Sequence, residues 1–153
     1  MKIHVTIALF AMLFATGCAE VQKPYQFTAA HPPDDAVDNV ARTLAANGHQ
    51  PQNVDRQTGI VTTKWEDTGF GYGFVQNVKA NIVRRFTVTI AHTPAGAAVT
   101  VRMDGKRCQE GGFTIGDTDV RGACEAMDDI VPSHQQDLDN LGMQVQRALQ
   151  TGG

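Results

Sequence analysis

The chain has 153 residues and carries 13 basic against 16 acidic side chains, a formal net charge of −3 at pH 7. Nucleic-acid binding requires a basic face, so this balance argues against a nucleic-acid partner. The length suits one domain that buries its own hydrophobic core.

The first 17 residues have the pattern of a secretory signal peptide. Lys2 precedes an apolar run from Ile3 to Phe14, which is too short to span a bilayer. Small residues follow, as expected at the end of such a signal. We therefore predict that residues 1–17 are removed on export.

The run Ala15-Thr16-Gly17-Cys18 resembles the lipobox of bacterial lipoproteins, although Leu is usual at the position of Ala15. The resemblance implies that Cys18 is acylated, with palmitate among its fatty acids. Two or more acyl chains would hold the protein stably on a membrane. Ala19 in second place implies the periplasmic face of the outer membrane. Soluble export after an ordinary cleavage is the alternative.

The next segment, residues 18–33, contains three prolines and no long apolar pattern. We predict a tether with a short strand at Tyr25 to Phe27. Fully extended, the tether would reach about 50 Å from the lipid. A single domain is expected over residues 34–150.

Apolar residues at helical spacing begin this domain and predict a helix that ends at Asn47-Gly48. Its buried face is expected to carry Val37, Val40, Ala41 and Leu44. A weak edge strand (Gln50 to Val54), a turn (Asp55 to Gly59) and a β-rich strand (Ile60 to Trp65) follow.

The sole tryptophan, Trp65, shares a predicted strand face with Val61 and Thr63. Side chains on one face of a strand lie two residues apart, so all three should point the same way. We expect Trp65 to pack under a helix as part of the core.

A β-hairpin is predicted next, because Ile82 to Ala91 and Ala98 to Met103 alternate apolar and polar residues around a Pro-Ala-Gly turn. Arg84 interrupts the apolar face, so the strand should be exposed there. Gly105 to Gly122 holds five glycines and is expected to be an irregular loop.

The last predicted element is a helix that begins with a capping box of Ser133 and Gln136. Its apolar stripe comprises Leu138, Leu141, Val145, Ala148 and Leu149. Two amphipathic helices and a one-faced antiparallel meander of about four strands can bury their apolar surfaces only against one another. The predicted fold is therefore a two-layer α+β domain.

The run from Val40 to Asp67, VARTLAANGHQPQNVDRQTGIVTTKWED, resembles the repeating unit of BamC-type outer-membrane lipoproteins. The matching positions are Asn47, Gly48, Asp55, Arg56, Gly59, Thr62, Thr63 and Trp65. The resemblance implies a helix-grip fold and an accessory role, with a protein partner in the envelope, in assembling outer-membrane β-barrels. This chain has room for one such domain where BamC carries two.

Cys108 and Cys124 remain once Cys18 is assigned to the lipid. An even pair in an oxidising compartment favours a disulfide, which for a loop of this length contributes about 3 kcal/mol. The alternative is a metal site with a histidine, but no C-x-x-C or H-x-x-x-H spacing supports it. We expect neither a metal nor another cofactor.

No catalytic pattern stands out in the sequence. Ser133 lies outside any G-x-S-x-G motif, and Asp117 to Gly122 matches only part of a calcium loop. The histidines of the exported chain have no metal-ligand spacing and are expected in solvated loops: His31, His49, His92 and His134. The protein is therefore expected not to be an enzyme.

Three aromatic residues, Phe70, Tyr72 and Phe74, alternate with glycines in GFGYGF. In an extended chain their rings would form a strip for contact with a protein, a sugar or lipid headgroups. Alternatively, the rings fold back over one end of the sheet. We expect a lipid-anchored, non-catalytic binding protein; a small periplasmic ligand-binding module or envelope enzyme using the glycine-rich loops is the alternative.

Overall fold

The computed structural model describes residues 22–30, 32, 34–71, 80–109, 114–115, 118–119, 124–127 and 132–150. Several predicted features lie outside these residues: the signal peptide, Cys18, His31, Tyr72, Phe74, Asp117 and Gly122. For Phe70 the structure describes the backbone only.

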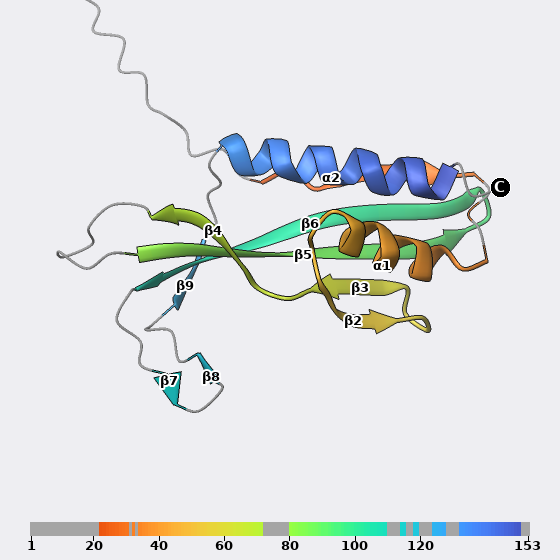
Figure 1. Cartoon of the computed structure of the whole chain (residues 1–153). Helices are drawn as coiled ribbons and strands as arrows, with labels where there is room; N and C mark the ends of the chain where they lie inside the picture. The colour runs from red at the N-terminus through yellow and green to blue at the C-terminus, as the bar shows by residue number, and fades with distance from the viewer. Residues whose placement is uncertain are drawn as a thin grey trace, which may run out of the picture.

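The described residues form two helices and nine strands (Figure 1). In chain order they are β1 (Tyr25–Ala29), α1 (Ala36–Ala46), β2 (Pro51–Asp55), β3 (Ile60–Thr63), β4 (Glu66–Gly71), β5 (Ala80–Thr93), β6 (Gly96–Gln109), β7 (Thr114–Ile115), β8 (Thr118–Asp119), β9 (Cys124–Met127) and α2 (Pro132–Gln150). Seven strands make one antiparallel sheet in the order β1-β6-β5-β3-β2, with β4 also on β5 and β9 also on β6. The predicted α+β class is confirmed.

The β5–β6 hairpin is the longest pairing of the sheet, and its partners run from Ala80↔Gln109 to Thr93↔Gly96. Its apolar residues alternate as predicted, since Phe86 and Val88 face Met103 and Val101 across the pair and are buried. Gly96 has a φ of 125°, and a Cβ there would lie 2.1 Å from the Ala29 carbonyl oxygen. Only glycine therefore fits this turn without strain.

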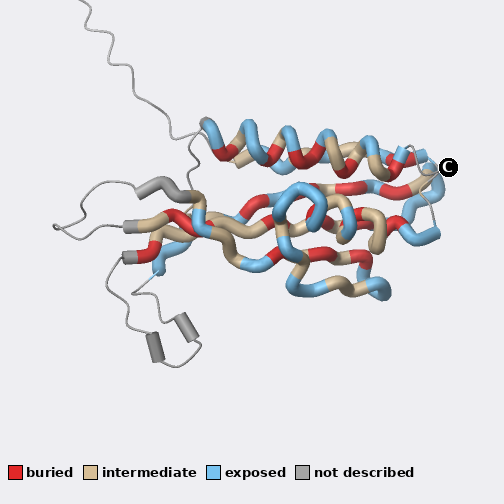
Figure 2. The backbone as a smooth tube through the Cα atoms, in the orientation of Figure 1, coloured by how far each residue is buried: buried red, intermediate tan, exposed pale blue. Residues whose placement is uncertain are grey.

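Both helices cover the same face of the sheet and pack against each other. Val40 and Leu44 of α1 are buried there, as are the four large apolar residues of the α2 stripe: Leu138, Leu141, Val145 and Leu149. Figure 2 shows buried residues recurring along the side of α2 that faces the sheet. The other face carries polar residues such as Arg85, Thr87 and Arg102.

The tether predicted over residues 18–33 has to be shortened, because Tyr25–Ala29 form β1 on the edge of β6. The Tyr25 hydroxyl donates to Gln146 Oε1 at 2.6 Å, and a Cβ on Gly142 would lie 2.3 Å from the Tyr25 ring. The second helix therefore packs closely on β1. The short strand predicted at Tyr25 to Phe27 is thus present and extends to Ala29, with Tyr25, Phe27 and Ala29 more buried than the residues between them.

Two further predictions need correction. The irregular loop over Gly105 to Gly122 is wrong at its start, since β6 continues to Gln109 and pairs with β9. The second helix begins at Pro132, so Ser133 already lies within the helix instead of capping it.

A disulfide joins Cys108 of β6 to Cys124 of β9, and the two residues are direct partners in the register of these strands. The cross-link spans 16 residues of sequence. A loop of this size corresponds to about 3 kcal/mol of stabilisation in the chain-entropy model. The bond fixes the short strand β9 to the sheet.

The expectation that Trp65 belongs to the core is wrong. Its ring is half-buried and lies against Arg85 and Lys106, whose Cζ and Nζ atoms are 4.7 and 4.4 Å from the ring centroid. Those two residues project from the face opposite the helices. The alternation of side chains between the two sheet faces is interrupted between Thr63, the last residue of β3, and the start of β4. At this point the Thr63 hydroxyl accepts a hydrogen bond from the Phe86 N–H at 2.9 Å.

Replacing Trp65 should therefore cost much less stability than replacing a core aromatic. We predict that Trp65→Ala lowers the free energy of unfolding by about 1–2 kcal/mol, since partly exposed ring and cation–π contacts are lost. Phe86→Ala, at a fully buried position, should cost about 3–5 kcal/mol. Urea unfolding followed by circular dichroism measures both values. Equal losses would contradict this assignment of Trp65 to the surface.

Candidate functional site

One hollow of the described surface lies at a gap in the sheet edge. Along one edge of β6, residues Ala97 to Val101 pair with β1, and residues Gly105 to Cys108 pair with β9. Among the described strands, none pairs with that edge at residues 102–104. The resulting hollow of about 470 Å³, here called the edge notch, is bounded by Gln22, Trp65, Arg85, Arg102, Lys106 and Met127.

The edge notch is cationic. Arg85 forms an ion pair with Asp104, whose Oδ2 lies 2.9 Å from the guanidinium Nε. Lys106 rests on Trp65, and exposed Arg102 makes no ion pair or hydrogen bond within the described part of the chain. Three cations against one carboxylate line this hollow, although the whole chain is acidic.

A donor without a partner also borders the edge notch. The Nε2 atom of Gln22 is buried and makes no hydrogen bond to any of the described residues. An unpaired buried donor is costly unless a ligand or water accepts from it. The lining therefore offers positive charge, one free amide donor and an aromatic ring, which together favour an anionic group.

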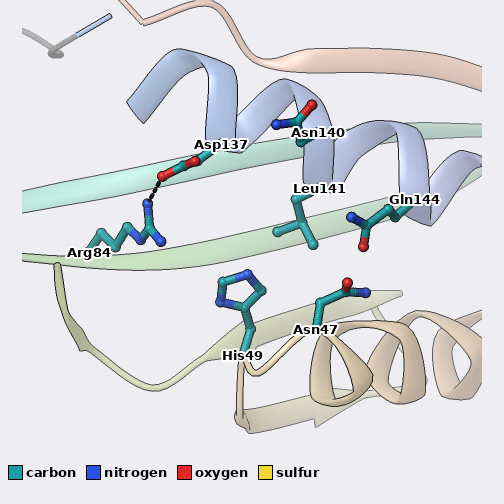
Figure 3. Close-up of a pocket in the computed structure, with 7 residues that line it drawn as sticks. All are labelled: Asn47, His49, Arg84, Asp137, Asn140, Leu141 and Gln144. Carbon is teal, nitrogen blue, oxygen red and sulfur yellow. Dashed lines mark hydrogen bonds and ion pairs between the residues drawn. The ribbon is translucent and has the colours of Figure 1, made fainter. Parts of the chain in front are cut away.

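A second, smaller hollow of about 160 Å³ lies where β5 and α2 meet the C-terminal end of α1. It is called the seam pocket here. Its lining comprises Asn47, His49, Arg84, Asp137, Asn140, Leu141 and Gln144 (Figure 3). Arg84 reaches from β5 to form an ion pair with Asp137 of α2. The expectation that the strand is exposed at Arg84 is wrong, because only 18% of this side chain is accessible.

A histidine–carboxylate pair flanks the seam pocket. His49 Nδ1 lies 2.8 Å from Glu66 Oε2, and the imidazole meets Phe86 edge-on with ring centroids 4.7 Å apart. Three buried polar atoms have no hydrogen-bond partner in the part of the chain that the structure describes: Glu66 Oε1, Arg84 Nε and Gln144 Oε1. The pocket can therefore hold a small polar ligand or water.

The seven lining residues include no serine, threonine, cysteine or lysine to act as a nucleophile. The volume is also below that of typical pockets for metabolite-sized ligands. Acid–base assistance by His49 and Glu66 is geometrically available, whereas covalent catalysis by a lining residue is not.

His134, expected in a solvated loop, is instead buried on α2. Burial lowers the pKa of its imidazole, the charge of Arg84 lowers it further, and Asp137 raises it. His49 is likewise not solvated, since 15% of its side chain is accessible, whereas His92 is exposed on β5.

The predicted site residues are only partly covered by the structure. Cys108 and Cys124 are brought together, while Cys18, Tyr72 and Phe74 lie outside the described residues. Within the described part, no group of three His, Cys, Asp or Glu side chains can hold a metal ion. No described helix is long and apolar enough to cross a membrane.

Sequence reasoning missed the edge notch, although one signal for it was available. The hairpin register places Arg85 opposite Asp104 and Arg102 beside it on the polar face, which follows from strand alternation alone. The position of Trp65 on this face depends on the break after β3 and could not be anticipated.

Comparison with known proteins identifies no family. No protein-family model matches the chain, and no curated protein matches it significantly. The resemblance to BamC-type lipoproteins therefore remains a prediction, as does acylation of Cys18.

The lowered pKa of His134 leads to a pH-dependent stability. The unfolded chain binds a proton near the ordinary pKa of 6.5, whereas folded His134 binds it only at lower pH. Because the unfolded state then holds more protons, the free energy of unfolding should fall as pH drops through 6.5. We expect His134→Gln to flatten this dependence between pH 7.5 and 5.5 in urea titrations.

His92→Gln, at an exposed position on the hairpin, serves as the matched control and should leave the pH dependence unchanged. An unaltered slope in His134→Gln would contradict the assigned role of this buried histidine.

Proposed function

We propose that the protein is a lipid-anchored, non-catalytic binding module of the bacterial envelope. In this proposal acylated Cys18 holds it on the periplasmic face of the outer membrane. The edge notch, with its three cations and Trp65, is the surface that binds another envelope component. The observation that carries the proposal is the cationic and aromatic lining of this notch in an otherwise acidic chain.

Several features of the notch support a binding role. Its cations lie on the sheet face that the helices leave uncovered, so a large partner can reach them. Arg102 is exposed, and Trp65 presents a partly accessible ring next to Arg85 and Lys106. Aromatic and arginine side chains are enriched where proteins bind partners.

The finer features follow from the resemblance to BamC-type lipoproteins. We propose a helix-grip arrangement, in which α2 lies along the β1–β6 side of the sheet, and an accessory role beside the machinery that assembles outer-membrane proteins. The second helix contacts both β1 and β6, which supports the arrangement. A protein partner in the envelope belongs to this proposal.

The seam pocket supports a second candidate function, a small-ligand module or envelope enzyme. Its favouring observation is the His49–Glu66 pair beside buried polar atoms without partners. The lack of a nucleophile among the lining residues and the small volume make this the weaker candidate.

The anchor is tested with a Cys18→Ser variant of the full chain. Without the thiol no acyl group can be attached, so the protein should leave the membrane fraction after a high-salt wash. Cys108→Ser combined with Cys124→Ser is the control and should stay membrane-bound. Sedimentation of Cys18→Ser with washed membranes would contradict the proposed anchor.

The binding surface is tested by photo-cross-linking in intact envelopes. A photoreactive amino acid at position 102 should yield mass-identified adducts with lipid or protein, because this position borders the edge notch. The same residue at position 42, exposed on α1, should yield few adducts. No adducts from position 102, or equal yields from both, would contradict a binding role for the notch.

A further inference from the structure

The folded domain begins very close to the proposed anchor. The Lys23 backbone N–H donates to Gln135 Oε1 at 3.1 Å, and Gln135 Nε2 donates to the Lys23 carbonyl at 3.0 Å. Two hydrogen bonds to α2 thus hold the chain at Lys23, two residues before β1 begins. The free tether after Cys18 is therefore much shorter than residues 18–33.

This short tether limits how far the domain can lie from the bilayer. Lys23 lies five residue steps after Cys18, and an extended chain advances at most about 3.6 Å per step, or about 18 Å in total. Gln22, directly before the held residue, is itself part of the wall of the edge notch. The anchor would therefore emerge beside the notch.

We propose that the edge notch rests on the anionic headgroups of the membrane that carries the anchor. This inference depends on the proposed acylation of Cys18. Arg102 and Lys106 meet headgroup phosphates. Trp65 lies at the interface between headgroups and water.

The chemistry of the notch fits this partner. Asp104 neutralises part of the charge of Arg85, but among described residues neither Arg102 nor Lys106 pairs with a carboxylate. Clustered cations close to an anionic lipid surface are attracted over about one Debye length, roughly 10 Å at 0.1 M salt. Tryptophan prefers the membrane–water interface because its ring is amphipathic.

The position of the notch favours lipid over an acidic protein partner. Its wall includes Gln22, the described residue nearest the anchor in sequence, and even the fully extended tether, at about 18 Å, is less than twice the roughly 10 Å range of the electrostatic attraction. An acidic protein would have to enter between the domain and the bilayer to reach the same cations. Protein binding at the notch is therefore the competing outcome of the test.

The sole tryptophan provides the probe. The acylated full chain is reconstituted into vesicles of equal parts phosphatidylglycerol and phosphatidylcholine, which contain a lipid with a nitroxide on its headgroup. We expect the emission of Trp65 to fall by about twofold or more, since an interfacial ring lies within reach of the quencher. In phosphatidylcholine alone, or in 1 M salt, the quenching should weaken.

Charge-reversal variants identify the side chains that hold the notch on the lipid. Arg102→Glu and Lys106→Glu should each reduce the quenching, whereas the matched change Arg42→Glu on α1 should not. Circular dichroism and melting temperature verify that all three variants remain folded. Equal quenching in the three variants would overturn the inference.

The outcomes separate the inference from the proposed function. Intact mass and sedimentation report acylation, so a chain without acyl groups in the supernatant overturns the anchor itself. An acylated, vesicle-bound chain whose Trp65 is not quenched overturns only the placement of the notch on headgroups. Exclusive protein adducts from position 102 would also overturn it, because they mean that the notch faces a protein.

Discussion

The fourteen-residue pairing of β5 with β6 is the constraint on which the other elements depend. One face of this hairpin supplies most of the sheet's buried apolar residues, and both helices pack there. Its outer edges pair with β1, β9, β3 and β4, and β2 pairs in turn with β3. Because β1 and β9 occupy separate lengths of the β6 edge, they leave the notch between them, and the disulfide fixes its β9 side.

Local patterns in the sequence were enough to predict the two helices and the centre of the hairpin, since residues such as Phe86 and Leu138 repeat at the period of their own element. Features that arise from long-range packing were not predictable. The strand at Tyr25 to Phe27 was predicted, but its pairing with β6 and its packing against α2 join segments far apart in sequence. The imidazole of His134 is buried only because the helix lies against the sheet. Trp65 changes face where the Thr63 hydroxyl interrupts the ladder.

The two polar hollows differ in how their charges are satisfied. In the seam pocket Arg84 pairs with Asp137 and His49 with Glu66, so these groups join the layers of the fold. Such partly buried pairs stabilise weakly in themselves but are costly to break singly. In the edge notch, by contrast, Arg102 is exposed without an ion pair in the described structure. Charge that the fold does not use is available for binding.

The central claim is that a short anchor holds the notch directly against the membrane. Neutron reflectometry of the acylated protein on a supported anionic bilayer measures this most directly, because it resolves water between the headgroups and the protein layer. We predict a protein layer that begins at the headgroups, with no separate hydrated layer. A water-filled gap comparable to the roughly 18 Å reach of the extended tether would contradict the claim.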